Sequence, residues 1–285
     1  IFVPLGIIYS EMKVTKYSGE LVHYDEQKLI NSLRKSGADQ AMAETIVKEI
    51  ESEMYEGISS KKIYKRAYQL LKNISNVHAA RYNLRTALLG LGPAGFFFEK
   101  FIAKVMQEQG FKTKVSVTLN GKCISHEIDI LLLKNDVVSM IECKFHSGQD
   151  AKSDVKVPMY ILSRFNDVKD RKYDLFSAKR NISKCIIVTN NKFTTDAIQF
   201  GECSGLNMLS WDYPQKNGIK ELVDKYRVYP VTCLTTLTKA EKDQLLILDC
   251  ITIKDLVLHP DYLKTIELSH NRIKNVLKEA NQLNN

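Results

Sequence analysis

The chain has 285 residues, of which 44% are hydrophobic and 26% charged, with a formal net charge of +8. This composition is ordinary for a globular protein and excludes a disordered or collagen-like chain, and the length allows two or three modest domains. The positive charge suits a polyanionic partner, although it is spread along the chain and not gathered in a basic tail.

Residues 1–8, IFVPLGII, are apolar but too short to span a bilayer, and they lack the features of a signal peptide. We therefore interpret residues 1–11 as a leader or an artificial extension ahead of a natural start at Met12, and expect no membrane partner. The six cysteines form no CxxC pair and lie mostly in strand-like or helical runs. This pattern predicts reduced, buried thiols in a cytoplasmic protein.

Residues 12–91 are predicted to form a small hairpin followed by a helical bundle. The segment MKVTKYSGELVHY (12–24) alternates and turns at Ser18-Gly19, as a hairpin does. Four helices follow, marked by capping residues and glycines: one that Asp25 caps and that ends before Gly37, one over 39–56, one from Ser59 or Ser60 to about Ile74, and one over 77–89.

Residues 92–215 begin at the Gly-Pro punctuation and follow the order helix, strands, then alternating helix and strand. That order predicts an α/β fold with a mixed sheet flanked by helices. The expected elements are a helix over 96–110, a strand over 112–119, two strands within 126–144, a helix over 153–170, a strand over 184–189, a helix over 194–203 and a strand over 206–211.

The two strands within residues 126–144, HEIDILLLKNDVVSMIECK, are almost wholly apolar, yet Asp129, Glu142 and Lys144 interrupt them. The Asn-Asp pair at 135–136 is the only turn-like dipeptide between them, and a two-residue loop there places Asp129 directly opposite Glu142. Residues directly opposite share a face, with Cβ atoms roughly 4.5–5.5 Å apart, and Lys144 shares that face too. The hairpin therefore predicts two carboxylates and an ammonium group in one cluster.

Two carboxylates this close repel each other unless a positive charge lies between them. Hard divalent cations prefer oxygen ligands, so we expect Asp129 and Glu142 to bind Mg²⁺ or Mn²⁺. Such a metal polarises a phosphate and acidifies a bound water, while Lys144 positions that water or neutralises developing charge. The pattern suits metal-assisted phosphodiester hydrolysis. The alternative is an ion-pair cluster on an exposed sheet face, which the apolar surroundings disfavour.

The pieces FFFEKFIAKVMQEQGFKTKV, HEIDILLL, IECKFH and CIIVTNNKFTTDAIQFGECSGLNMLSWD occur in that order along residues 92–212. In order and spacing they resemble the Mrr-like branch of the PD-(D/E)XK restriction endonucleases. The resemblance implies a restriction-endonuclease-like core in which Asp129, Glu142 and Lys144 are catalytic and DNA is the substrate. It also implies that Glu99, on the preceding helix, completes the site, with a solvated helix charge as the alternative.

Four further polar residues near the motif have open roles. His126 and His146 flank it, and a histidine beside a strand is more often a hydrogen-bonded structural group than a catalytic one. Lys156 and Arg164 lie in SDVKVPMYILSRFNDV, which resembles the family helix that follows the motif. They either touch phosphates or are solvated surface charges.

Residues 14–29, VTKYSGELVHYDEQKL, resemble the start of an ATP cone, a regulatory nucleotide-binding module of many ribonucleotide reductases. GISSKKI (57–63) and AARYNLR (79–85) match later parts of that module, whereas Tyr17 replaces its usual arginine. The resemblance implies that ATP or dATP binds as a regulatory ligand, without hydrolysis because a Walker A motif is absent. The residues expected to bind it are Val14, Lys16, Asp25, Lys28 and Ser60. The alternative is that both lysines are ordinary surface charges.

Residues 216–285 are predicted to form a small all-α domain, with three or four short helices from Thr238 onward. LTKAEKDQLLILDCITIKDLV and LSHNRIKNVLKEANQL resemble helix-hairpin-helix modules, which grip the DNA backbone through helix N-termini. The alternative is an amphipathic bundle used for packing or dimerisation.

These observations predict a Mg²⁺-dependent endodeoxyribonuclease that acts in restriction or another defence against foreign DNA. We expect the nucleotide in the cone to modulate its activity or its homo-oligomerisation. The rival hypothesis is a nucleotide-sensing DNA-binding regulatory protein with an inactive nuclease fold, which the complete D…ExK set disfavours. RNA processing is a third possibility, although no aromatic stacking motif for RNA is evident.

Overall fold

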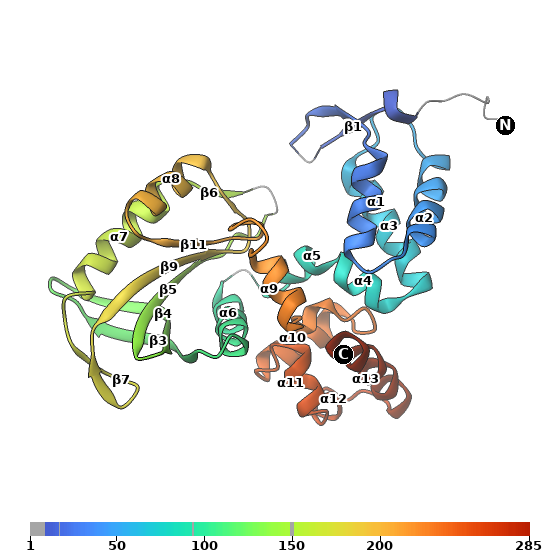
Figure 1. Cartoon of the computed structure of the whole chain (residues 1–285). Coiled ribbons are helices and arrows are strands. Elements are labelled where there is room, and N and C mark those ends of the chain that lie inside the picture. Colours follow the sequence, from blue (N-terminus) through green and yellow to red (C-terminus); the bar gives the residue numbers. More distant parts are fainter. Residues whose placement is uncertain (1–8, 17, 93, 149–150) are drawn as a thin grey trace. The chain divides into compact units, whose positions relative to one another are not determined.

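The computed structural model describes residues 9–16, 18–92, 94–148 and 151–285 (Figure 1). The chain packs into two compact units, one of residues 1–84 with 233–236 and one of residues 85–232 with 237–285. Most of the expected leader lies outside the described residues. In the described chain, no helix is both long and apolar enough to cross a bilayer.

The first unit contains the predicted hairpin and helices. Strands β1 and β2 pair antiparallel, and an isolated bridge joins Thr15 of β1 to Ser59. The helices are amphipathic and bury residues such as Leu33 and Leu71 completely. The elements are a 3₁₀ turn at Tyr9–Glu11, β1 (Lys13–Thr15), β2 (Leu21–His23), α1 (Glu26–Lys35), α2 (Gln40–Ser52), α3 (Ser60–Ile74) and α4 (Asn76–Tyr82).

Two helix boundaries differ from the prediction. Helix α2 stops at Ser52, and the following turn ends with the Gly57 amide donating to the Lys13 carbonyl of β1 at 2.9 Å. The expected helix over 77–89 is divided into α4 and α5 (Leu84–Leu89) at Asn83. The Asn83 side chain there accepts a hydrogen bond from the Tyr64 hydroxyl at 3.0 Å, a contact 19 residues away in sequence.

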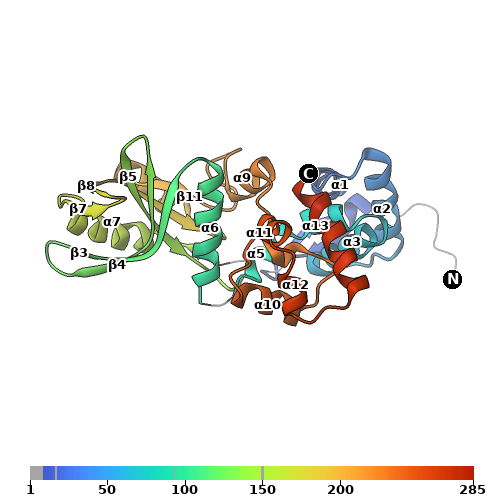
Figure 2. The ribbon, with the colours of Figure 1, turned by 90° about the horizontal axis from the view of Figure 1, so that it is seen from below.

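The second unit is built on a five-stranded mixed sheet in the order β11-β9-β5-β4-β3. Strands β3, β4 and β5 form an antiparallel meander, and β5, β9 and β11 run parallel. Helices α7 and α8 cover one face and α6 lies on the other (Figures 1 and 2). This confirms the α/β fold. The bounds are α6 (Phe96–Glu108), β3 (Lys112–Asn120), β4 (Ser125–Lys134), β5 (Val137–Lys144), α7 (Lys156–Val168), β9 (Ile182–Thr189), α8 (Thr195–Cys203) and β11 (Asn207–Leu209).

The β4–β5 hairpin has the predicted register. Asn135 and Asp136 form the turn with positive φ values of 51° and 61°, as a tight two-residue hairpin requires. Pairing runs from Lys134↔Val137 to Ile130↔Ile141 and ends there. On the other side of β4, the β3 register skips the position of Asp129. Strand β4 therefore loses regular pairing on both edges at Asp129, which opens the sheet at that residue.

The sequence did not predict several small elements. They are β6 (Lys152–Ser153), which pairs with β10 (Lys192–Phe193), the hairpin of β7 (Tyr173–Leu175) and β8 (Ala178–Arg180), helix α9 (Ile219–Tyr226) and a 3₁₀ turn at Val231–Cys233.

The C-terminal segment is all-α, as predicted. It contains α10 (Lys239–Ile247), α11 (Ile253–Leu258), α12 (Tyr262–Thr265) and α13 (His270–Asn284).

The prediction of buried cysteines is wrong for two of the six. Cys123 and Cys203 are exposed, because one lies in the loop before β4 and the other in the last turn of surface helix α8. Cys143 is half-buried, and the remaining three are buried in the core.

Candidate active site

The expected catalytic side chains meet in one cavity of about 360 Å³ at the end of the hairpin. Four different elements supply them: the first turn of α6, the break in β4, the end of β5 and the exposed side of α7. The polar lining residues are Glu99, Asp129, Glu142, Lys144, Lys156, Tyr160 and Arg164.

At Asp129 the backbone pairing of β4 with β5 has ended, and the side chain makes the contact with β5 instead. Its Oδ2 accepts a hydrogen bond from the backbone amide of Cys143 at 2.6 Å, so the carboxylate connects β4 to the end of β5. Burial raises the pKa of Asp129, while the Cys143 amide and the nearby Arg164 oppose that rise. This carboxylate is therefore fixed in position and borders the cavity with its charged end.

Glu142 is nearly enclosed, with 4% of its surface exposed. Its Oε2 accepts from Nη1 of Arg164 at 2.7 Å, whereas its Oε1 is buried without a hydrogen-bond partner among the described residues. Burial, and then the charge of Asp129, raises the pKa of Glu142 to about 8 even though Arg164 lowers it. A buried acceptor with no donor is costly unless another positive group satisfies it.

Glu99 projects from the first turn of α6 into the same cavity. Burial raises the pKa of Glu99 to about 7, with further contributions from Asp129 and Glu127. Phe98 beside it packs against Phe145, which follows the motif lysine, with ring centroids 5.5 Å apart. The start of α6 is thus attached to the end of β5.

The donor set fits a hard divalent ion. Among the described residues, no three His, Cys, Asp or Glu side chains form a group that could hold a metal. Magnesium, however, is commonly bound by one or two carboxylates, with waters and substrate phosphates as the remaining ligands. Asp129 and Glu142 supply such a pair, and the unpartnered Oε1 of Glu142 is an oxygen donor of the required kind. Arg164 would have to release Oε2 for Glu142 to bind an ion with both oxygens.

Lys144 is exposed on the cavity wall, where its ammonium group can approach a phosphate. Arg164 contacts Glu142 and also donates through Nη2 to the Glu127 carbonyl, so it is neither a simple surface charge nor an available phosphate contact. Sequence reasoning placed Arg164 on the correct helix. It missed the contact with Glu142, because a long side chain reaches a partner that only the packing of α7 brings near.

The two flanking histidines lie outside the cavity lining. His126 Nε2 lies 2.8 Å from Asp167 Oδ2, a contact that attaches the start of β4 to the end of α7. His146 Nε2 lies 2.9 Å from the Ser153 hydroxyl. Both contacts are structural, which is the more frequent role of such histidines.

The residues expected to bind nucleotide all belong to the first unit, and all except Ser60 lie near its start. Val14 is buried in its core, and Lys16 forms an exposed ion pair with Glu20 at 2.9 Å. Asp25 caps α1 by accepting from the Lys28 amide at 2.9 Å. Ser60 is the first residue of α3, and the bridge between Thr15 and Ser59 brings it beside β1. Their role in nucleotide binding stays a prediction.

Comparison with known proteins assigns three segments of the chain. Family models match residues 12–86 as an ATP cone domain, residues 94–213 as a restriction endonuclease of the Mrr catalytic type, and residues 229–284 as "AF1548-like, C-terminal". The first two matches cover the segments in which the sequence resembles these domains.

Individual relatives agree with these segments. A protein of Archaeoglobus fulgidus described as "Uncharacterized protein" is 32% identical over 183 residues, which are 64% of this chain and 99% of the relative. The solved structure "Crystal Structure of Protein of Unknown Function AF1548" is 31% identical, covers 66% of this chain and 97% of its own, and has a TM-score of 0.55. Can2 from Sulfobacillus thermosulfidooxidans in complex with cyclic tetra-adenylate has a TM-score of 0.32 at 13% identity, over 70% of this chain and 54% of its own, which is too low to support an argument.

Proposed function

The chain belongs to the AF1548-like family and carries a restriction endonuclease domain and an ATP cone domain, and on that premise we propose that it is a metal-dependent endodeoxyribonuclease. The observation that carries the proposal is the meeting of Asp129, Glu142, Glu99 and Lys144 in one cavity at the break in the sheet. Burial, and then repulsion by neighbouring carboxylates, raises the pKa values of these three carboxyl groups, and a hard cation bound between them would offset both effects.

We assign each side chain one role. Asp129 and Glu142 hold Mg²⁺ or Mn²⁺, and Glu99 completes the acidic set. When bound, such an ion polarises the scissile phosphate and lowers the pKa of a bound water. Lys144 places its ammonium group against the phosphate and offsets the charge that develops during attack. Arg164, released from Glu142, keeps its positive charge at the wall of the cavity.

Cleavage of supercoiled plasmid DNA tests this function. The wild-type protein should cut with Mg²⁺ or Mn²⁺ and not with EDTA. Asp129→Asn, Glu142→Gln and Lys144→Met should each lower the rate by at least about 100-fold, the cost of removing one electrostatic group from a transition state. Lys264→Met changes an exposed lysine of α12 and should leave the rate unchanged. Full cutting by Glu142→Gln or Lys144→Met would reject the site assignment.

For the ATP cone domain we propose a regulatory role, with ATP or dATP as the ligand. Lys16 and Lys28 are exposed cations at the start of the domain, and the helix starts at Asp25 and Ser60 carry backbone amides that suit phosphate. Plasmid cleavage and light scattering, each with and without ATP and dATP, should show a change in rate or in the size of a homo-oligomer. No response of either readout to either nucleotide would remove this role.

A second candidate function follows from the contact between Arg164 and Glu142, because Arg164 occupies Oε2, one of the two Glu142 oxygens that could bind a metal. In that case the chain is a nucleotide-sensing DNA-binding regulatory protein whose nuclease fold is inactive. It would bind DNA with strong salt dependence and cut neither DNA nor RNA with any divalent ion. Our first proposal places the protein in the cytoplasm, in restriction or another defence against foreign DNA.

A further inference from the structure

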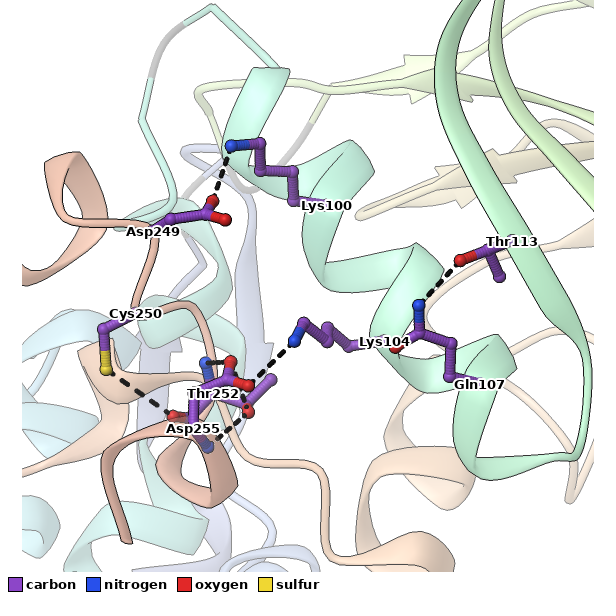
Figure 3. Close-up of polar contacts among 8 residues, drawn as sticks. All are labelled: Lys100, Lys104, Gln107, Thr113, Asp249, Cys250, Thr252 and Asp255. Atoms are coloured by element: carbon purple, nitrogen blue, oxygen red, sulfur yellow. Dashed lines mark hydrogen bonds and ion pairs between the residues drawn. The ribbon is translucent and has the colours of Figure 1, made fainter. Parts of the chain in front are cut away.

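Helix α6 carries a charged stripe that faces the C-terminal helices. Lys100, Lys104 and Glu108 are spaced four residues apart, so they lie on one side of the helix. Each has an oppositely charged partner on or just before α11, and Figure 3 shows the two lysine pairs. The pairs are Lys100–Asp249 at 2.5 Å, Lys104–Asp255 at 2.8 Å and Glu108–Lys254 at 2.6 Å.

The central pair ends on a carboxylate that is already held in place. The Thr252 amide donates to Asp255 Oδ2 at 3.0 Å and the Asp255 amide donates to the Thr252 hydroxyl oxygen at 3.2 Å, which forms the capping box of α11. The Thr252 hydroxyl also donates to Asp255 Oδ2 at 2.9 Å. The other oxygen, Oδ1, accepts from Lys104, and only 16% of the Asp255 side chain is exposed. This pair therefore differs from a solvated surface pair. The Asp255 side chain is already fixed by the capping box, so forming the ion pair costs little of its conformational entropy.

The start of α6 has no local side-chain cap, so its position is set by contacts with the rest of the unit, which are the packing of Phe98 on Phe145 and the charged stripe. Its N-cap residue is Gly95, with φ of 81°, and among the described residues no N-cap side chain accepts a hydrogen bond from the backbone amides of the first turn. By contrast, side chains cap α1, α2, α3 and α8. The uncapped turn carries Glu99, whose Oε1 lies 3.7 Å from the position that a Cβ on Gly95 would take.

The far end of α6 is attached to the sheet. Gln107 donates to the Thr113 hydroxyl of β3 at 2.7 Å (Figure 3). Phe98 and Phe101, in the first half of the helix, are fully buried. The helix thus has its apolar side on the sheet and its charged stripe on the C-terminal helices. Together with this packing and the contact of α6 with α9, the stripe restrains the helix from Lys100, the residue after Glu99, to Glu108, its last residue.

We propose that the C-terminal helices clamp α6 and thereby fix Glu99 at the carboxylate cavity, with Lys100, Lys104 and Glu108 as positioning residues. This role rests on the proposed nuclease activity. It makes the C-terminal segment part of the catalytic unit, because a displacement of about 1 Å in a catalytic group can lower a rate by about 100-fold.

A charge swap tests the clamp. Lys254→Glu places a glutamate against Glu108 and should open the contact. Adding Glu108→Lys restores an opposite-charge pair, in which each new residue also suits its helix end. Lys104→Met is a second lesion that keeps the aliphatic stem, and Lys264→Met is the control for losing a lysine from the same segment.

Two readouts separate the clamp from the nuclease activity. Hydrogen exchange of residues 96–104 should be several-fold faster in Lys254→Glu and Lys104→Met, and should return to the wild-type rate in the swap. In the same proteins kcat for plasmid cleavage should fall about 10-fold with KM unchanged, and the swap should recover it.

Unchanged exchange in both lesions would overturn the clamp, as would faster exchange without loss of kcat. Failure of the swap to recover either readout would overturn it as well. If the wild-type protein does not cut DNA, the proposed function fails, and the exchange arm alone still decides whether the clamp exists.

Discussion

The buried carboxyl group of Glu142 should make the metal-free protein less stable as pH rises. Burial and Asp129 raise the pKa of Glu142 to about 8, from an ordinary value of 4.5. Between these two pH values the folded chain holds a proton that the unfolded chain releases, so the free energy of unfolding falls as pH rises through this window. The loss is complete above pH 8, and the shift corresponds to about 5 kcal/mol.

Glu142→Gln removes this titration and leaves an amide oxygen that can still accept from Arg164. We expect the variant to gain stability relative to wild type between pH 5 and 9, by up to about 5 kcal/mol. Urea unfolding in EDTA measures the difference in the free energy of unfolding between the two proteins. The fluorescence of the single tryptophan, Trp211, reports on the unit that contains the site.

Glu241→Gln is the matched control. The ion pair with Arg272 lowers the pKa of Glu241 to about 2, so the stability that this group contributes is present above its ordinary pKa and is lost only in acid. The difference in the free energy of unfolding between Glu241→Gln and wild type should therefore be constant from pH 5 to 9. Parallel pH curves for Glu142→Gln and wild type would refute the reasoning, because they would mean that Glu142 is charged in the metal-free protein.

Three further predictions follow from the geometry. The rate of plasmid cleavage should increase as pH rises through about 7 to 8. The carboxyl groups of Glu99 and Glu142, with pKa values of about 7 and about 8, must lose their protons before the acidic set binds an ion. The midpoint should move to lower pH as Mg²⁺ increases, and a fixed midpoint in initial-rate profiles would contradict this. Lys16→Ala should weaken ATP or dATP binding by at least about 10-fold in calorimetry, the loss of one hydrogen bond to a charged group, whereas Lys48→Ala, an exposed lysine of α2, should not. Leu71→Ala, a fully buried core residue, should cost about 2–5 kcal/mol of unfolding free energy in urea followed by circular dichroism; a cost below about 1 kcal/mol would mean that this core collapses around the cavity.

The part of the site that depends on local turn chemistry could be predicted from the sequence. Asn135 and Asp136 tolerate positive φ and their turn fixes the register. Extended one residue beyond its last pair, Ile130↔Ile141, that register predicts Asp129 opposite Glu142. Helix starts with capping side chains, such as Asp25 in α1, were predictable for the same reason. In each case a few adjacent residues determine the geometry.

The parts that depend on distant packing could not be predicted. Ser116 has a φ of 52° in the middle of β3, and no local signal marks it as the place where pairing beside Asp129 is interrupted. The contact of Arg164 with Glu142 needs α7 to be docked on the sheet. The charged stripe of α6 reads as a solvated helix face until the C-terminal helices pack against it.

Binding of Mn²⁺ tests the central claim most directly, because the account requires Asp129 and Glu142 to hold a hard ion. Calorimetric titration at pH 8.5, above the pKa of about 8 of Glu142, should show binding to the wild-type chain and to Glu241→Gln. Asp129→Asn and Glu142→Gln should each weaken that binding by about 100-fold or more, the upper end of what loss of a supporting partner costs a metal site. Equal Mn²⁺ affinity in all four proteins would contradict the account.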